Sequence, residues 1–302
     1  MTVAQASHIS RLAGPATVVA DHSWPGTSAT VLRLLDPGGR QMILKRNTSK
    51  GSFQREHAAL ACWTGALGAS APQLLDADEA EQDLLMTSVT GRPLALLSLT
   101  RVQEHRAYGV AGELLARFHH AAAPSTLPHF GRDRAVYIRA QLTAGTAPLT
   151  AAEADMVHEA LDLLARMPPQ KTQPSHLDFT SRNILAHPCG RPAGMVDFET
   201  SRHEARGRDF LRITQRTLLH RPDLRQEFYR GYGRQPDAAE RELIRICTVT
   251  DAAAIAATAT ATATAQRRHA FAAEARSTLT AALRTWPEPT PGTAIPHARR
   301  PL

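Results

Sequence analysis

The chain has 302 residues, of which 43% are hydrophobic, and a formal net charge of +7. This length and composition exclude a fibrous or wholly disordered protein and allow one large domain or two modest ones. The excess of positive charge lies in residues 91–302, where 28 basic side chains are interleaved with 20 acidic ones. Such mixing is typical of solvated helix faces, so we expect no nucleic acid among the partners.

Neither export nor membrane insertion is predicted. The N-terminus has no basic start followed by an apolar core, and the Ala/Thr-rich stretch from Thr248 to Gln266 is too weakly apolar to span a membrane. We therefore expect a cytoplasmic monomer or homodimer that does not bind membranes. The three cysteines, Cys62, Cys189 and Cys247, lie far apart in the sequence, which predicts buried free thiols rather than disulfides or a zinc site.

Three short apolar runs near the N-terminus predict a small antiparallel meander. They cover residues 16–20, 28–35 and 40–46 and are separated by turn residues. Side chains alternate along a strand, so Ile43 and Lys45 share one face of the third run. The chain contains 3 lysines and 32 arginines, and a lysine inside a strand therefore suggests a specific role.

A helix is predicted to follow the meander. It covers residues 53–63, with Ser52 as its N-cap, and Glu56 lies in its middle on a partly apolar face. Two further strands are predicted at residues 72–76 and 83–89. The first 90 residues therefore predict a sheet with one helix.

Long helical patterns dominate beyond residues 90–94, a loop that we expect to be the hinge between two lobes. These patterns cover residues 102–121, 151–167, 223–233, 237–265 and 267–285. The stretch after Trp286 is proline-rich, which favours disorder. We expect an N-lobe over residues 1–90, a helical C-lobe over 91–286 and a disordered tail over 287–302.

One polar stretch carries the residues that point to chemistry. His176, Asp178 and Asn183 are close enough in sequence to share a loop, in which Asp178 would accept a substrate proton and Asn183 would offer a neutral oxygen to a metal ion. This order suits phosphoryl transfer, because Mg²⁺ bridges the charged phosphate oxygens and needs hard oxygen ligands. The alternative is that these side chains only bond a tight loop, since Asp and Asn favour turns.

A hairpin is predicted directly after this loop. The apolar residues 184–185 and 194–196 favour two short buried strands joined by a Pro/Gly turn. Asn183 precedes the first strand and Asp197 follows the second. We therefore expect the hairpin to bring these two possible metal ligands together.

The spacing of His176, Asp178 and Asn183, followed by Asp-Phe-Glu at residues 197–199, resembles the aminoglycoside phosphotransferase family, relatives of the protein kinases that phosphorylate small molecules. Protein kinases carry His-Arg-Asp and Asp-Phe-Gly at these places, which favours the small-molecule branch. Leu177 stands where many members of the family have glycine. The resemblance implies an α+β, protein-kinase-like two-lobe fold, with a small antiparallel β-sheet N-lobe that includes one helix and a larger, mainly helical C-lobe.

The resemblance also implies an O-phosphotransferase, a small-molecule kinase that uses ATP or GTP with Mg²⁺. Asp178 would be the catalytic residue, and Asn183 and Asp197 the metal ligands. Lys45 would contact the α- and β-phosphates and would be held in place by Glu56. Order and spacing along the chain match this pair.

Further residues receive supporting roles from the resemblance. Met86 and Ser88, close to the expected hinge, would contact the nucleotide base. Asp209 is expected at the start of a helix. Its carboxylate would hold the loop that contains His176 by binding backbone amides of that loop. His119 would make a structural hydrogen bond beside that loop.

The expected acceptor is a hydroxyl group of a small-molecule antibiotic, which phosphorylation would inactivate. Aminoglycosides are polycations that need carboxylates around them, whereas residues 200–302 hold more arginine than acid. A less cationic nucleoside or sugar-containing antibiotic is therefore as plausible as an aminoglycoside. Two alternatives stay open: a metabolic kinase acting on choline, homoserine or a sugar, and a catalytically silent kinase-like binding protein.

Overall fold

The structure is a computed structural model. It describes residues 11–23, 29–145, 149–189, 191–258 and 265–286. The tail expected to be disordered, residues 287–302, lies outside the described residues, as does the part of the Ala/Thr-rich stretch at residues 259–264. No helix in the described ranges has the length and apolar character needed to cross a membrane.

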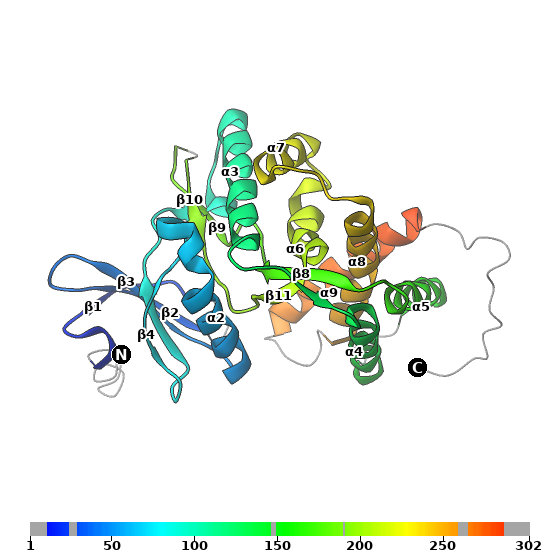
Figure 1. Cartoon of the computed structure of the whole chain (residues 1–302), viewed down its shortest axis with the longest axis horizontal. Helices are drawn as coiled ribbons and strands as arrows, with labels where there is room; N and C mark the ends of the chain where they lie inside the picture. Colours follow the sequence, from blue (N-terminus) through cyan, green and yellow to red (C-terminus); the bar gives the residue numbers. More distant parts are fainter. Residues whose placement is uncertain (1–10, 24–28, 146–148, 190, 259–264, 287–302) are drawn as a thin grey trace. The chain divides into compact units, whose positions relative to one another are not determined.

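An antiparallel five-stranded sheet forms the N-terminal part of the fold (Figure 1). Its strands are β1 (Thr17–Asp21), β2 (Thr30–Leu35), β3 (Gln41–Arg46), β4 (Leu74–Asp78) and β5 (Asp83–Thr87), in the order β1-β2-β3-β5-β4. On one face Leu34, Met42, Leu44 and Leu85 pack into a buried cluster. Successive side chains of a strand alternate between faces, so Lys45, next to Leu44, belongs to the opposite face.

Helix α2 (Lys50–Cys62) follows β3 and confirms the predicted helix, although its start differs. The N-cap is Ser49, whose hydroxyl accepts a hydrogen bond from the backbone amide of Ser52 at 3.1 Å. The prediction that Ser52 caps the helix is therefore wrong. Both serines precede the apolar positions of the helix, and only the backbone shows which of them supplies the acceptor.

Helix α3 (Arg101–His119), from the first half of the chain, packs against helix α7 (Pro222–Tyr232), from the last third (Figure 1). Their contact depends on glycine. A β-carbon at Gly112 would lie 2.0 Å from the carbonyl oxygen of Phe228, too close for any side chain. The absence of a β-carbon therefore lets the two backbones approach each other directly.

Short strands and one helix surround the polar stretch. They are β8 (Gln170–Ser175), β9 (Ile184–Ala186), β10 (Pro192–Met195), β11 (Arg202–Ala205) and α6 (Arg206–Ile213). The antiparallel β9–β10 pair, in which Ile184 lies opposite Met195, confirms the predicted hairpin. Strands β8 and β11 also pair antiparallel, with Ser175 opposite Arg202, and were not predicted because their sequences are polar and lack alternation.

The chain divides into two compact units. The first contains residues 1–125 and 171–237, and with them the sheet, α2, α3, the hairpin, α6 and α7. The second contains residues 126–170 and 238–302. Its helices are α4 (Phe130–Ala144), α5 (Ala151–Ala165), α8 (Ala238–Thr258) and α9 (Ala265–Thr285). Helix α4 was not predicted, and the expected lobe boundary at residue 90 stays a prediction.

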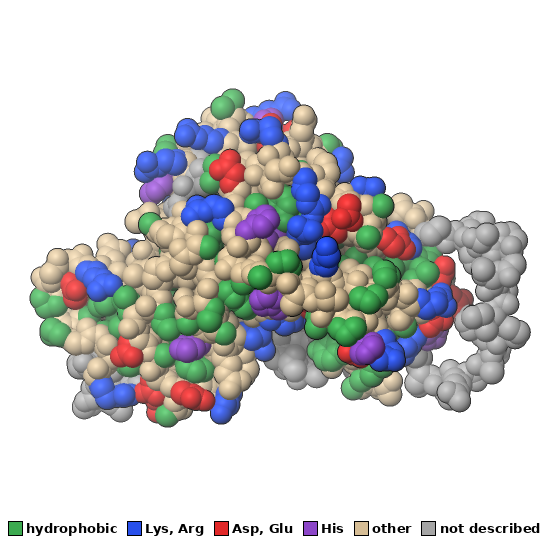
Figure 2. All heavy atoms as spheres, in the orientation of Figure 1, with side chains coloured by type: hydrophobic (Ala, Val, Ile, Leu, Met, Phe, Trp, Pro, Cys, Tyr) green, Lys and Arg blue, Asp and Glu red, His purple; other side chains and the backbone are tan. Residues whose placement is uncertain are grey.

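The remaining elements are short. They are η1 (Thr64–Ser70), β6 (Arg92–Pro93), η2 (Leu94–Leu96), β7 (Ser125–Leu127) and the π-helical turn η3 (Thr214–Leu218). On the face that Figure 2 draws, Lys and Arg side chains lie among acidic, hydrophobic and uncharged groups. The mixing of charges along the sequence thus reappears on this surface.

The three cysteines are free, but the expectation that all are buried is wrong. Cys247, in α8, is buried, whereas Cys62 and Cys189 are exposed. Cys62 is the last residue of α2, and Cys189 lies in the turn between β9 and β10. Chain positions at the end of a helix and in a tight turn face solvent, whatever the preference of the residue type.

Candidate active site

The loop between β8 and β9 places Asp178 and Asn183 side by side. The Asn183 side-chain nitrogen donates to the backbone carbonyl of Asp178 at 2.9 Å and to its Oδ2 at 3.0 Å. The nitrogen of the amide is thereby occupied, and no described residue engages its oxygen. The loop thus presents a carboxylate and a neutral amide oxygen at adjacent places.

The β9–β10 hairpin places Asp197 next to this loop. The backbone amide of Val196 donates to the carbonyl oxygen of Asn183 at 3.0 Å, so the residues after β10 run beside Asn183. The backbone of Asp197 is left-handed, with φ of 72°. A non-glycine residue in this region is strained, and such strain concentrates at functional sites.

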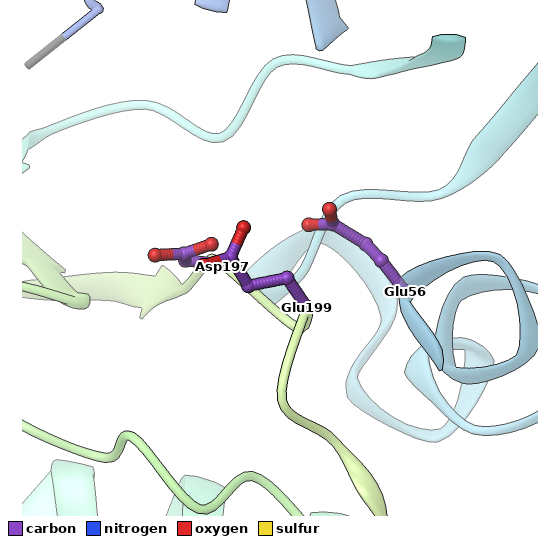
Figure 3. Close-up of side chains that lie close together, drawn as sticks. All are labelled: Glu56, Asp197 and Glu199. Carbon is purple, nitrogen blue, oxygen red and sulfur yellow. The ribbon is translucent and has the colours of Figure 1, made fainter. Parts of the chain in front are cut away.

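Lys45 of β3 meets three carboxylates. Its Nζ lies 2.9 Å from Glu56 Oε2 and 2.6 Å from Asp197 Oδ1. Glu199 Oε2 lies 3.2 Å from the same nitrogen. Figure 3 shows how these carboxylates approach one another, Glu56 from helix α2, Asp197 and Glu199 from the chain that follows β10. The structure therefore brings Lys45, Glu56 and Asp197 together.

Burial decides how these charges behave. The side chains of Lys45 and Glu56 are 8% and 2% exposed, whereas that of Asp197 is 37% exposed. Burial alone would lower the pKa of Lys45, but the surrounding carboxylates outweigh it and raise this pKa. Burial also raises the pKa of Glu56, while Lys45 overcomes burial at Asp197 and lowers the pKa of that carboxyl. Lys45 therefore stays charged over the whole physiological range.

Asp209 in the first turn of α6 holds the backbone of the loop between β8 and β9. Its Oδ2 accepts the amide of His176 at 2.6 Å and its Oδ1 that of Leu177 at 2.5 Å. His119 Nε2 donates to Asp209 Oδ2 at 2.9 Å, and the Tyr232 hydroxyl donates to His119 Nδ1 at 2.7 Å. One chain of buried hydrogen bonds thus joins α7, α3 and α6 to the loop.

The sequence comparison decides the family. Residues 24–244 match the profile of the phosphotransferase enzyme family, which is more than half of the chain. The chain belongs to this family. A search of curated protein sequences gives no match.

Solved structures resemble this phosphotransferase over nearly its whole length. A candidate aminoglycoside phosphotransferase from Ralstonia eutropha has a TM-score of 0.70 and 15% identity, with 93% of this chain and 96% of that chain covered. A thermostable mutant of the aminoglycoside phosphotransferase APH(4)-Ia, solved with ADP and hygromycin B, has a TM-score of 0.68 and 17% identity, with 95% and 100% covered. Aminoglycoside 2'-phosphotransferase-IIIa, solved with GDP, has a TM-score of 0.66 and 12% identity, with 94% and 98% covered. These neighbours confirm the kinase-like α+β fold.

In this phosphotransferase the ring of His176 links the loop between β8 and β9 to the hairpin. Its Nε2 donates to the carbonyl oxygen of Val196 at 3.0 Å, and its Nδ1 accepts the amide of Asp178 at 3.3 Å. These two contacts assign the ring proton to Nε2. Between these residues Leu177 has a left-handed backbone, with φ of 63°, which turns its amide toward Asp209. His176 and Asp209 therefore fix the loop through separate hydrogen bonds.

Two arginines that sequence analysis did not single out flank Asp178. Arg212 Nε lies 3.6 Å from Asp178 Oδ1, and Arg182 Nη2 lies 4.0 Å from Asp178 Oδ2. One signal for Arg212 was present in the sequence. It follows Asp209 by three residues, and residues three apart share one face of a helix.

The residues expected to contact the nucleotide base lie at the end of β5. Met86 is opposite Ile43 and Leu74 in the sheet and is 4% exposed. Ser88 follows the strand and is half-buried. Because the side chain of Met86 is buried, a contact with the nucleotide base would come from the backbone of Met86. The role of Met86 and Ser88 stays a prediction.

Proposed function

We propose that this phosphotransferase transfers the γ-phosphoryl group of ATP or GTP to a hydroxyl group of a small-molecule antibiotic and inactivates it in the cytoplasm. The observation that carries this proposal is the contact between Lys45 and Asp197. It places the cation suited to bind phosphates against the carboxylate suited to bind a metal ion. Asp178 and Asn183 lie next to that carboxylate through the β9–β10 pairing.

The oxygen donors fit Mg²⁺. Asn183 supplies an amide oxygen and Asp197 a half-exposed carboxylate, and hard oxygen ligands of this kind are those that Mg²⁺ prefers. Carboxylate oxygens of Glu56, Asp197 and Glu199 also lie within 4.8 Å of one another. Glu56 is engaged by Lys45 and by the amide of Phe198, so we assign the metal to Asn183 and Asp197. Bound Mg²⁺ would neutralise charge on the phosphate oxygens.

In the proposed reaction the acceptor hydroxyl oxygen forms a bond to the γ-phosphorus while the bond from that phosphorus to the β–γ bridging oxygen breaks. Asp178 orients the hydroxyl group and accepts its proton, which then passes to solvent. Lys45 stabilises the phosphate charge, and Glu56 holds Lys45 in position. His176 and Asp209 keep the loop in the conformation that this geometry requires.

Two other functions fit the same fold. A metabolic kinase acting on choline, homoserine or a sugar would use the same residues with another acceptor. A catalytically silent binding protein is disfavoured, because Asp178, Asn183, Asp197 and Lys45 are all present and lie together. Release of ADP or GDP in the presence of Mg²⁺ and candidate acceptors separates the catalytic functions from the silent one.

The test replaces Asp178. We expect Asp178→Ala to abolish turnover and to leave the affinity for the magnesium–nucleotide complex nearly unchanged, since Lys45, Asn183 and Asp197 remain. Asp162→Ala, at a 41% exposed position of α5, is the matched control and should keep full turnover. Nucleotide affinity is measured by calorimetric titration. Loss of nucleotide binding in a folded Asp178→Ala protein would contradict the assigned role.

A further inference from the structure

Two guanidinium groups share one catalytic carboxylate. From this arrangement we infer that the acceptor carries an acidic group, a carboxylate or a phosphate, close to the hydroxyl that is phosphorylated, and that Arg212 and Arg182 bind this group. The inference rests on the proposed function and names the substrate class of the same site. It favours an anionic acceptor over a polycationic aminoglycoside.

Asp178 attracts the two arginines but forms a hydrogen bond with neither of them. Arg212 Nε approaches Oδ1 at 3.6 Å and Arg182 Nη2 approaches Oδ2 at 4.0 Å, both beyond hydrogen-bonding distance. Their side chains are 37% and 38% exposed, and that of Asp178 is 19% exposed. The carboxylate of Asp178 meanwhile accepts a hydrogen bond from Asn183 at 3.0 Å. Arg212 can therefore reach a ligand without giving up a hydrogen bond to Asp178.

Arg212 is held where an acceptor must bind. It lies one turn after Asp209 on α6, and Asp209 is bonded to the backbone of the catalytic loop. The helix therefore fixes Arg212 relative to Asp178. Among the residues that the structure describes, no carboxylate other than that of Asp178 lies within ion-pair distance of Arg212.

Arg182 also acts on the nucleotide side of the site. Arg182 directly precedes Asn183, which we assign to the metal, and lies 4.0 Å from Asp178. Against burial, Lys45 and more weakly Arg182 lower the pKa of Asp197. A variant of Arg182 would therefore disturb nucleotide and acceptor together. Arg212 is the cleaner probe of the acceptor.

The local charge decides between acceptor classes. Beside Arg212 and Arg182 an ammonium group meets two like charges, whereas an acidic group meets two opposite charges. A carboxylate or phosphate instead gains charge-assisted hydrogen bonds, for which the planar guanidinium group is well shaped. The hydroxyl beside such an acidic group would then lie next to Asp178.

The first experiment measures anion binding with the nucleotide site filled. Inorganic phosphate is titrated calorimetrically into the full-length protein saturated with Mg²⁺ and AMP-PNP, whose γ-phosphate occupies the donor position. We expect wild-type protein to bind phosphate, Arg212→Gln to bind it about tenfold more weakly, and Arg212→Lys to retain part of the affinity. Arg101→Gln is the matched control, because Arg101 lies 3.7 Å from Asp223, a spacing close to that of Arg212 from Asp178. It should bind phosphate as wild type does.

The second experiment measures nucleoside diphosphate release with three matched sugars, glucuronate, glucose and glucosamine, and with kanamycin. Glucuronate should have the highest kcat/KM, and Arg212→Gln should raise its KM while the KM for ATP stays constant. Absence of phosphate binding, equal phosphate affinity in folded Arg212→Gln, or preference for glucosamine or kanamycin would overturn the inference. If AMP-PNP itself does not bind, the proposed function fails and this inference fails with it. If no sugar is turned over, the phosphate titration decides.

Discussion

Lys45 Nζ and Asp197 Oδ1 lie 2.6 Å apart, although the first belongs to a strand of the N-terminal sheet and the second to a turn more than a hundred residues later. Glu56 completes the pair from α2 and is almost fully buried. The sheet, the helix and the hairpin are therefore tied together by one charged nitrogen. In the proposed function, binding of a nucleotide exchanges part of this contact for phosphate oxygens.

Removal of that nitrogen should damage stability as well as activity. Lys45→Met leaves Glu56 buried without a counter-charge, and we expect the free energy of unfolding to fall by about 3–5 kcal/mol. The double variant Lys45→Met/Glu56→Gln removes the buried charge and should regain much of this loss, while phosphoryl transfer stays abolished. Urea unfolding measures stability. Equal stability of Lys45→Met and wild type would show that the ion pair has no structural role.

The buried histidine that contacts Asp209 should make stability depend on pH. Burial lowers the pKa of His119 below its ordinary value of 6.5 in spite of the neighbouring Asp209. Below that value the unfolded chain binds a proton that the folded chain excludes, so the free energy of unfolding falls as pH falls.

The contribution of His119 is isolated with a variant. His119→Gln keeps polar contacts with Asp209 and Tyr232 but has no ring to protonate, so its stability should change less than that of wild type between about pH 7.5 and about pH 5.5. Urea unfolding at both pH values gives the comparison. Identical pH dependence in the two proteins would refute the prediction.

The left-handed backbone of Leu177 predicts an unusual order of stabilities. Alanine normally stabilises a protein relative to glycine, but with φ of 63° a β-carbon costs about 1–2 kcal/mol. Leu177→Gly should therefore be more stable than Leu177→Ala by about 1 kcal/mol. Thermal unfolding of both variants measures the difference. A more stable alanine variant would mean that the backbone at this position relaxes.

The contact between α3 and α7 should not tolerate a methyl group. A β-carbon at Gly112 would meet the Phe228 carbonyl oxygen at 2.0 Å and the Tyr232 amide nitrogen at 2.7 Å. Both are backbone atoms, so the helices must separate, and we expect Gly112→Ala to lose about 3 kcal/mol or more of stability. Gly65→Ala, where nothing lies within 4 Å of the added atom, is the control. Similar unfolding temperatures for the two variants would contradict the helix contact.

The sequence predicted best where chemistry restricts residue type. The hairpin after Asn183 and the helix that contains Glu56 are confirmed, because each combines an apolar pattern with turn residues at its ends. That Lys45, Asp178 and Asp197 belong to one site was implied by the resemblance to the aminoglycoside phosphotransferase family. The polar strands β8 and β11 were not predicted, because their pairing with each other, rather than an apolar pattern in either sequence, makes them strands.

Other features depended on three-dimensional context. Whether Ser49 or Ser52 caps α2 depends on backbone angles that the sequence does not reveal. Arg212 was read as part of a solvated helix face, because a count of charges does not show which residue faces Asp178. The position of Arg212 beside Asp178, on which the inferred acceptor class depends, is thus set by tertiary contacts.

The hydrogen bond between Val196 and Asn183 also separates the parts of the hairpin that can vary from those that cannot. Asn183 precedes β9 and Asp197 follows β10, so both lie at the open end, and the connecting turn lies at the other end. Insertions or deletions in that turn leave the open end in register. A slip of one residue within β10 would instead send alternate side chains to the wrong face. A change of length in the connecting turn should therefore be tolerated, whereas the same change between β10 and Asp197 should separate the two possible metal ligands.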